Sequence, residues 1–255
     1  MVEYRVADGR ATLTIDDPER RNPMSAETMD SLVEMTRAAI DDPAVRVLVY
    51  TGAGDKAFSA GGDLSSGFVD DPIGLHRRRG ALADLFRVMR SGGKPTVARV
   101  NGHALAGGFG LAVACDITIC VDDAKLGTTE VNVGLWPMMI SAVLGGAMPA
   151  KAALELMMTG RIITPHEALS LGAVSRVVPR DQLDTAVDET VAMLMAKSAV
   201  TLALGRDAFY AARDLGFDAA LDRLQAGLTA VSLTEDSREG VLAFVERRDP
   251  RWSHH

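Results

Sequence analysis

The chain of 255 residues has only two cysteines, few aromatic side chains and no excess of positive charge. Cys115 and Cys120 form no metal-ligand pattern with the histidines. So low a cysteine content points to a reducing compartment. The net charge of -7 argues against general affinity for nucleic acid or for an anionic membrane. The basic run at residues 76–79 is typical of a solvated helix face, with contact to a ligand phosphate as the alternative.

The sequence also lacks the signals of secreted and membrane-spanning chains. Residues 1–13 have neither the basic start nor the apolar stretch of a signal peptide, so we expect a cytoplasmic protein. Residues 131–150 contain no charged side chain and are long enough to cross a bilayer. Pro137, Pro149 and the pair Gly145-Gly146 interrupt this segment and favour a buried part of a core.

Hydrophobic periodicity predicts that strands and helices alternate in the first part of the chain and that the last hundred residues are nearly all helical. The expected elements are a hairpin with strands at 2–6 and 10–16, a helix at 26–40 capped by Ser25, a strand at 46–51, a helix at 72–89, strands at 95–100 and 117–121, and helices from Met138 onward. We therefore expect one α/β core over residues 1–195 and a helical region over residues 196–255.

Two glycine-rich segments stand out because each follows a predicted core strand. AFSAGGDL occupies residues 57–64, and ALAGGFG occupies residues 104–110. Open α/β sheets place ligands at the carboxyl ends of their strands, and small residues there let a ligand reach main-chain N–H groups. A helix that starts in the second segment adds the positive end of its dipole. The two segments together predict a site that stabilises an anion.

Two other motifs compete for these segments. Gly108-Phe109-Gly110 begins a dinucleotide-binding fingerprint, but the third glycine position is Val113, which weakens that interpretation. Ser59 in AFSAG resembles the nucleophile of a hydrolase elbow and would need a later histidine such as His166. His166 follows Thr164-Pro165 in a segment typical of a surface helix start, so the hydrolase hypothesis is the weaker one.

The chain resembles the crotonase family of enoyl-CoA hydratases and isomerases along nearly its whole length. The resemblance rests on AFSAGGDL, NGHALAGGFGLAVACDI, LGTTEVNVGLWP, TGRIITPHEALSLGAVSRVV and FVERRDPRW, which stand in the family's order. It implies an α/β fold of spiralling ββα turns, with a helical C-terminal region that supports trimerisation and covers the CoA pocket. It further implies an acyl-CoA thioester substrate, a homotrimer or homohexamer, and no metal or cofactor other than the CoA of the substrate.

The resemblance also implies a catalytic device. In this family two backbone N–H groups hold the thioester oxygen as an enolate forms, and here they match Ala60 and Gly107. Family hydratases carry two glutamates; the second matches Glu130, whereas the first is replaced by Gly110. Family isomerases, which move one proton from C2 to C4, carry only the second glutamate, so Glu130 is expected to act as a single acid/base.

Three expectations follow for the surroundings of these residues. Glycine at position 110 is expected to leave space for a branched or long acyl chain. Burial is expected to raise the pKa of Glu130. The neighbours expected to enclose this carboxyl are Val131, Val133, Leu135 and Trp136.

The remaining implied positions concern substrate and CoA binding. Asp63 is expected to organise its loop, and Arg21 and Arg247 to reach the pantetheine or phosphates of CoA. The other positions matched to the substrate site are Pro23, Ser59, Gly61, Gly62, Leu64, Gly108, Gly110 and Pro137. Three functions stay open: isomerisation or hydration of an unsaturated acyl-CoA, decarboxylation or carbon-carbon cleavage of an acyl-CoA, and acyl-CoA binding without turnover.

Overall fold

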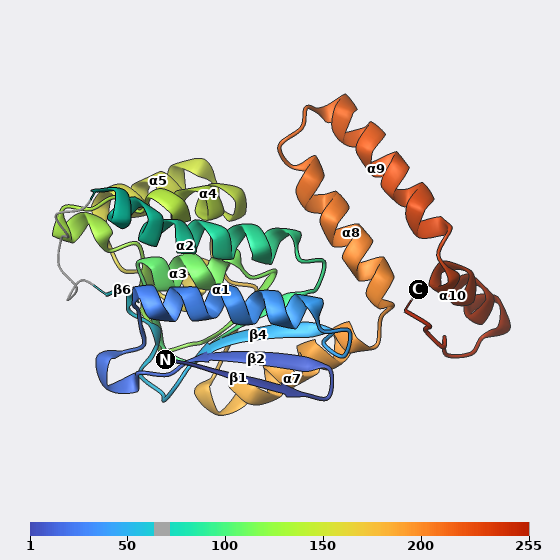
Figure 1. Ribbon diagram of the computed structural model, residues 1–255, viewed down its shortest axis with the longest axis horizontal. Coiled ribbons are helices and arrows are strands. Elements are labelled where there is room, and N and C mark those ends of the chain that lie inside the picture. The colour runs from blue at the N-terminus through green and yellow to red at the C-terminus, as the bar shows by residue number, and fades with distance from the viewer. Residues whose placement is uncertain (64–71, 255) are drawn as a thin grey trace.

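The main sheet has six strands in the order β1-β2-β4-β7-β9-β11, with helices packed against it (Figure 1). The computed structural model describes residues 1–63 and 72–254. The strands of this sheet are β1 Val2–Ala7, β2 Arg10–Ile15, β4 Val47–Gly52, β7 Thr96–Val100, β9 Ile117–Val121 and β11 Arg176–Val178. The β1–β2 hairpin is antiparallel, and every later pairing in this sheet is parallel. The predicted hairpin and the predicted strands of the core are confirmed.

Two smaller parallel sheets lie beside the main one. The first has the order β10-β8-β5, with β5 Ala57–Ser59, β8 His103–Leu105 and β10 Leu126–Gly127. The second pairs β3 Pro23–Met24 with β6 Gly61–Gly62. Short strands of this kind leave no alternating pattern in the sequence, and none of these five strands was predicted.

The helices lie close to the ranges predicted from periodicity and capping. They are α1 Ala26–Asp41, α2 Pro72–Ser91, α3 Gly107–Ala114, α4 Met138–Ala147, α5 Ala150–Thr159, α6 Pro165–Ser170, α7 Leu183–Met195, α8 Ala199–Ala212, α9 Phe217–Ser232 and α10 Glu235–Glu246, with single turns η1 Pro18–Arg20, η3 Glu130–Val133 and η4 Arg180–Gln182. The Ser25 hydroxyl accepts from the Thr28 amide and caps α1, as predicted. Residues 131–150 divide among η3, α4 and the start of α5, and no described helix is both long and apolar enough to cross a membrane.

The core lies between the main sheet and its helices. Its largest fully buried side chains include Leu13, Tyr50, Phe58 and Phe109. Cys115, which ends α3, and Cys120 in β9 are both buried free thiols. Burial raises the pKa of the Cys120 thiol to about 12, so neither cysteine sits in the electropositive, exposed setting that makes a thiol reactive.

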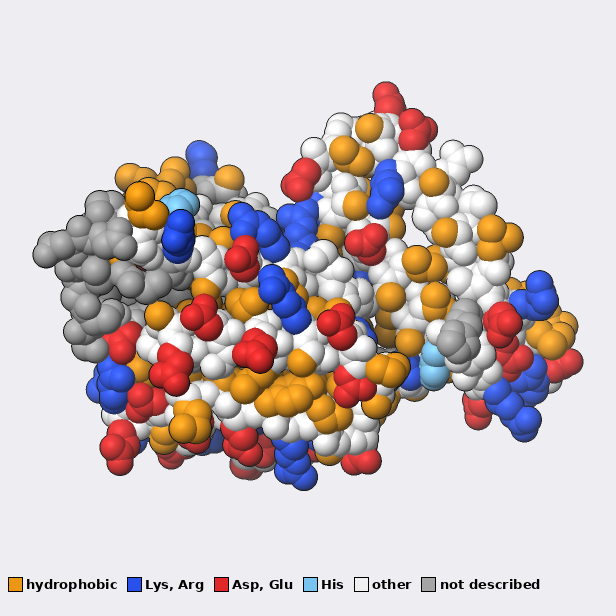
Figure 2. All heavy atoms as spheres, viewed as in Figure 1, with side chains coloured by type: hydrophobic (Ala, Val, Ile, Leu, Met, Phe, Trp, Pro, Cys, Tyr) orange, Lys and Arg blue, Asp and Glu red, His pale blue; other side chains and the backbone are white. Residues whose placement is uncertain are grey.

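The C-terminal helices α8, α9 and α10 form an arm that extends away from the core (Figure 1). Asp116 anchors α8 to the core because its carboxylate accepts hydrogen bonds from Arg206 at 2.8 Å and from Tyr210 at 2.7 Å. Apolar side chains spread over the arm (Figure 2). Those exposed there include Phe209, Phe217, Leu221, Leu224, Leu228, Leu233, Val241, Leu242, Phe244 and Val245. Exposed apolar side chains gathered on one part of a molecule are typical of an interface.

Candidate active site

Three parallel strands bring the predicted site segments to one edge. In the β10-β8-β5 sheet, Ala104 pairs with both Ser59 and Leu126, and Leu105 pairs with Gly127. The chain leaves β5 into residues 60–62, leaves β8 into Ala106 and Gly107, and leaves β10 into residues 128–130. Because the carboxyl ends of parallel strands meet at one edge, the two glycine segments and Glu130 emerge together, as the sequence predicted.

The two glycine segments are in direct contact, and this contact explains their composition. A Cβ on Gly61, whose φ is +89°, would lie 2.7 Å from the Ala106 Cβ and 3.1 Å from the Gly107 nitrogen. A Cβ on Gly108 would fall on the Ser59 carbonyl oxygen and within 2.7 Å of the Ser59 Cβ. Any larger residue would therefore push the end of β5 away from the start of α3.

The first amide of helix α3, that of Gly107, lies at this contact. Ala106 precedes it with φ 51° and ψ -128°, a conformation that L residues rarely adopt, and its N–H donates to the Gly127 oxygen at 2.8 Å. The first bond within the helix runs from the Gly110 amide to the Ala106 oxygen at 3.1 Å. The amide of Gly107 therefore has no acceptor inside the helix and is available to a ligand.

Ala60 does not supply the second of the two amides that were predicted to hold the thioester oxygen. The Ala60 N–H donates to the Arg21 carbonyl at 2.9 Å, so this amide is already satisfied within the protein. The Asp63 amide points to β3, where it donates to the Met24 oxygen at 3.3 Å. Since successive strand residues point their amides to opposite sides, the Gly62 amide turns away from β3. It lies 3.9 Å from where a Gly107 Cβ would stand, and Gly62 is exposed. The geometry corrects the Ala60 prediction in favour of Gly62.

Glu130 begins η3 and is half-buried. Its Oε2 is shielded from solvent and has no hydrogen-bond partner among the described residues, and the same holds for the Thr128 hydroxyl. Burial raises the pKa of the Glu130 carboxyl, opposed in part by the hydrogen bond from its own backbone amide. The predicted direction is confirmed. Val133 and Trp136, however, are 57% and 37% exposed, so they do not enclose the carboxyl as expected.

The expected space at Gly110 is already filled. A Cβ placed there would overlap the Ile140 Cγ2 methyl, would lie 2.7 Å from the Ile140 Cβ and would lie 3.6 Å from the Phe86 ring. Ile140 is only 2% exposed. The prediction of an open acyl pocket at Gly110 is therefore wrong, because a side chain thirty positions later along the chain packs against the bare backbone.

This packing predicts a measurable coupling. Gly110→Ala is expected to destabilise the protein by about 1–3 kcal/mol, the usual cost of overpacking a close-packed core. Ile140→Ala alone is expected to cost about 2–5 kcal/mol because it leaves a cavity. In the double variant the new methyl group enters that cavity, so the two losses should not add. Denaturant unfolding of all four proteins measures the coupling, and strictly additive losses would contradict the contact.

Buried asparagines hold the loop that leads into the first glycine segment. The Asn22 amide group donates to the Ala57 oxygen at 2.7 Å and to the Ala53 oxygen at 2.9 Å. The Asn101 amide group donates to the Gly54 oxygen at 2.8 Å. Both asparagines are almost fully buried. Sequence reasoning missed this role, although Asn101 opens the quoted motif NGHALAGGFGLAVACDI and directly follows a predicted strand.

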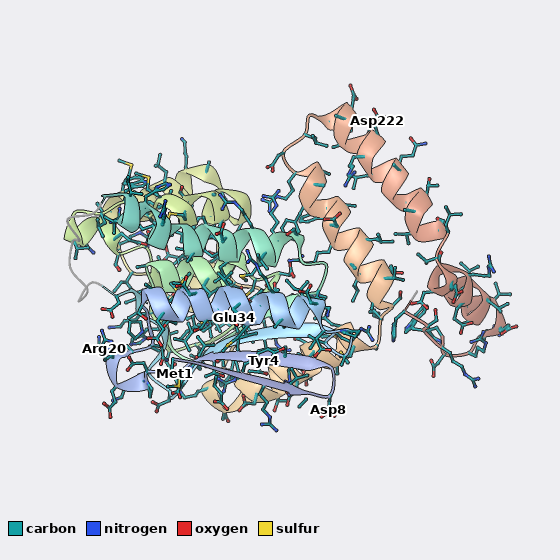
Figure 3. The ribbon with its side chains drawn as sticks, viewed as in Figure 1. Met1, Tyr4, Asp8, Arg20, Glu34 and Asp222 are labelled. Atoms are coloured by element: carbon teal, nitrogen blue, oxygen red, sulfur yellow. The ribbon has the colours of Figure 1, made fainter. Side chains whose placement is uncertain are left out.

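Of the charged residues around the first glycine segment, Asp63 forms an ion pair and Arg21 is exposed to solvent. Asp63 accepts from the Arg20 guanidinium at 2.8 Å, an ion pair within its loop, and Figure 3 places Arg20 at this end of the molecule. Arg21 is exposed, with a left-handed φ of 66°.

Two prolines predicted for the substrate site are buried. Pro23 lies in β3 opposite Gly61, and Pro137 lies immediately before α4. Leu64 lies outside the described residues.

The single chain does not bring Arg247 to this site. Arg247 caps the C-terminal end of α10, and α10 lies at the opposite end of the molecule from β6 (Figure 1). Contact between Arg247 and CoA therefore requires a second copy of the chain and stays a proposal.

The competing motifs find no support in the geometry. Ser59 is fully buried, and its hydroxyl accepts from the Gly61 amide at 3.1 Å, whereas His166 is exposed on α6. Gly108 meets the Ser59 backbone, which leaves no room for a pyrophosphate. No group of three or more potential metal ligands occurs in the described part of the chain.

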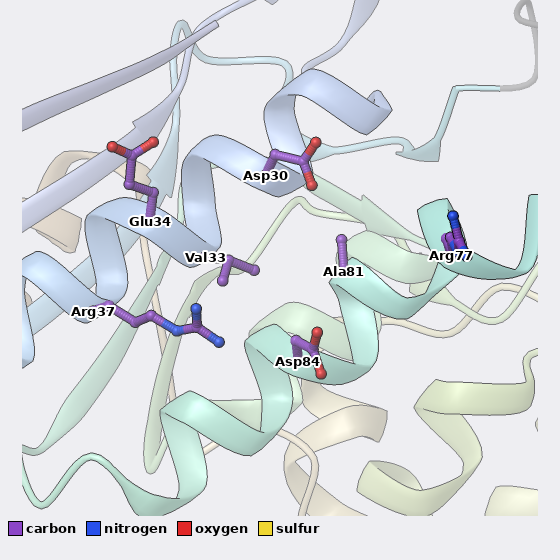
Figure 4. Close-up of a pocket in the computed structure, with 7 residues that line it drawn as sticks. All are labelled: Asp30, Val33, Glu34, Arg37, Arg77, Ala81 and Asp84. Atoms are coloured by element: carbon purple, nitrogen blue, oxygen red, sulfur yellow. The ribbon is translucent and has the colours of Figure 1, made fainter. Parts of the chain in front are cut away.

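A groove between α1 and α2 is separate from the strand-end site (Figure 4). It encloses about 350 Å³ and is lined by Asp30, Val33, Glu34, Arg37, Arg77, Ala81 and Asp84. His76, Arg77 and Arg79 are exposed on α2, as the interpretation of the basic run as a solvated face requires.

The comparisons with known proteins agree with this architecture. The enoyl-CoA hydratase/isomerase family model matches residues 6–255, and the chain belongs to that family. A Thermus thermophilus protein with the provisional name enoyl-CoA hydratase is 41% identical, over 95% of this chain and 96% of its own. The crotonyl-CoA hydratase of Syntrophomonas wolfei is 32% identical, over 93% and 92%. The crystal structure of an enoyl-CoA hydratase from Mycobacterium smegmatis superimposes with a TM-score of 0.94 and 29% identity, over 98% of both chains. The protein is thus an enzyme of this family with the crotonase fold.

Proposed function

We propose that the protein converts an unsaturated acyl-CoA through a thioester enolate, with Glu130 as its single acid/base. The Gly62 and Gly107 amides donate to the thioester oxygen as negative charge develops on it. Donors that are already oriented at this stage are worth about 10²–10³-fold in rate each. The free N-terminal end of α3 adds its dipole at the same place.

The proton transfer that fits one base is the isomerisation of a 3-enoyl-CoA to a 2-enoyl-CoA. The Glu130 carboxylate takes a proton from C2, the electron pair moves so that the double bond lies between C2 and C3, and the same carboxyl returns the proton to C4. The observation that carries this proposal is the Glu130 Oε2 atom. It is buried and has no hydrogen-bond partner among the described residues, on a carboxyl whose pKa is raised by burial. A carboxyl with a raised pKa is a stronger base than an ordinary glutamate, which suits a group that takes up a proton and gives it back.

Hydration is the second candidate, favoured by the names of the relatives. A further relative of 35% identity, from Salmonella arizonae, is named carnitinyl-CoA dehydratase, which also fits chemistry with water. Against it stands Gly110, which supplies no carboxylate at the position of the first family glutamate and whose neighbouring space is filled by Ile140. Decarboxylation or carbon-carbon cleavage, and binding without turnover, stay as the less favoured alternatives.

Incubation with 3-hexenoyl-CoA and, separately, with crotonyl-CoA tests the proposal. We expect 2-hexenoyl-CoA from the first substrate at a rate at least about tenfold above the hydration of the second, a margin of about 1.4 kcal/mol in barrier. Products are identified by chromatography and mass. Rapid formation of 3-hydroxybutyryl-CoA without isomerisation would establish the hydratase instead.

We further propose that the exposed apolar arm is buried between copies in a homotrimer or homohexamer, where it covers the CoA pocket and brings Arg247 to a neighbouring site. The family resemblance and the exposed side chains of α9 and α10 support this assembly. Arg21, exposed beside β3, is the second cation proposed for CoA. A cytoplasmic location and the absence of any cofactor besides the CoA of the substrate complete the proposal.

A further inference from the structure

Ile140 connects the two elements that carry the proposed chemistry. It lies in the first turn of α4, ten residues after Glu130, and its side chain packs against Gly110 in α3. Gly110 stands one helical turn beyond Gly107, the proposed donor to the thioester oxygen. Phe86 from α2 adds an aromatic ring 3.6 Å from the position of a Gly110 Cβ. Ile140 and Phe86 therefore form an apolar, closely packed wall one helical turn beyond the donor amide.

The chemistry of this wall bears on what happens to the 2-enoyl-CoA while it is still bound. A water molecule needs two to four polar partners to be held in a buried site, and isoleucine offers none. Hydration of a 2-enoyl-CoA breaks an O–H bond of water, joins the hydroxyl to C3 and places a proton on C2, so it requires a positioned water. Isomerisation moves one proton from C2 to C4 and requires none.

We propose that Ile140 is a specificity-determining residue, which keeps water away from the acyl group so that the 2-enoyl-CoA formed when the proton reaches C4 leaves the site without being hydrated. This inference rests on the proposed function of Glu130. It makes the partition between isomerisation and hydration depend on the polarity of the residue at position 140 and not on its bulk.

Valine and threonine at position 140 form the matched pair for the test, because they have nearly the same shape and differ by one hydroxyl. With 3-hexenoyl-CoA as substrate, initial rates of 2-hexenoyl-CoA and 3-hydroxyhexanoyl-CoA formation give the product ratio. Ile140→Val is expected to keep the ratio within about twofold of wild type. Ile140→Thr is expected to raise the hydrated fraction about tenfold over Ile140→Val, the equivalent of one hydrogen bond to water.

Val143 supplies the control on the same helix. It is half-buried against the core and carries no proposed role, so Val143→Thr introduces the same hydroxyl one turn further along α4. This variant is expected to leave the product ratio unchanged, and its unfolding midpoint shows what a buried hydroxyl costs in this helix.

The outcomes separate the two proposals. If wild type isomerises and Ile140→Thr and Ile140→Val give equal product ratios, the Ile140 inference is overturned and the single-base function stands. A shift of the ratio by Val143→Thr equal to that by Ile140→Thr overturns it as well, since the effect then belongs to the helix. If wild type forms no 2-hexenoyl-CoA, the proposed function fails, and the inference that rests on it fails too.

Discussion

Glu130→Gln is expected to lower isomerisation by about 10²–10⁴-fold, the usual contribution of a positioned general acid/base. Glutamine keeps the shape of the side chain but accepts no proton from C2. The dissociation constant for a non-reacting CoA thioester should change little, because the thioester oxygen is held by backbone amides. Single-turnover rates and equilibrium binding separate the two effects. A variant with near-normal turnover would remove Glu130 from the mechanism.

The same substitution has a consequence for stability, with a definite sign. Because burial raises the pKa of Glu130 in the folded protein, the folded state binds more protons than the unfolded state between the two pKa values. Stability is therefore highest below the unfolded pKa and falls as the pH rises through the folded pKa. Glutamine has no proton to lose, so Glu130→Gln is expected to be more stable than wild type at neutral pH. This advantage should shrink as the pH falls below the ordinary range of a glutamate. Unfolding midpoints at neutral and acidic pH measure the difference.

Gly108→Ala is expected to cause the second large loss, through geometry alone. The new methyl group would fall on the backbone of Ser59, which is fully buried and cannot swing aside like a flexible side chain. The end of β5 must then move away from α3, and the Gly62 and Gly107 amides separate. A misplacement of about 1 Å costs about 10²-fold in rate, and overpacking costs about 1–3 kcal/mol in stability.

Gly145→Ala is the matched control for this prediction. Gly145 lies in α4, and nothing stands within 4 Å of its would-be Cβ. Alanine in a helix interior is preferred to glycine by about 1 kcal/mol, so this variant should keep its activity and gain a little stability. If Gly108→Ala behaved like Gly145→Ala, the close contact of the two glycine segments would be contradicted.

The local features of the fold could be predicted from the sequence because each has a local signal. The hairpin, the Ser25 cap and the buried strands followed from periodicity and capping. The two glycine segments were predicted to share one site because each follows a core strand. The rise in the pKa of Glu130 followed from its apolar sequence neighbours, although Val133 and Trp136 turned out to be exposed.

The predictions that failed depend on partners distant in sequence. Which amide beside Gly61 is free depends on the two-residue strand β3, which pairs with β6, and on the Arg21 carbonyl before β3, which accepts from the Ala60 amide. No periodicity marks so short a strand. Whether Gly110 borders an open pocket depends on Ile140, a contact made only by tertiary packing of α3 on α4. Similarly, the position of Arg247 depends on the direction of the arm.

The fate of the proton taken from C2 tests the single-base account most directly. 3-Hexenoyl-CoA carrying deuterium at C2 is incubated with the enzyme, and the 2-hexenoyl-CoA formed at early times is examined by NMR and mass spectrometry. If Glu130 carries the proton from C2 to C4 beside an apolar wall, deuterium appears at C4 in wild type, and Glu130→Gln forms almost no product. Formation of 2-hexenoyl-CoA with no deuterium at C4 even at the earliest times, or undiminished product from Glu130→Gln, would contradict the account.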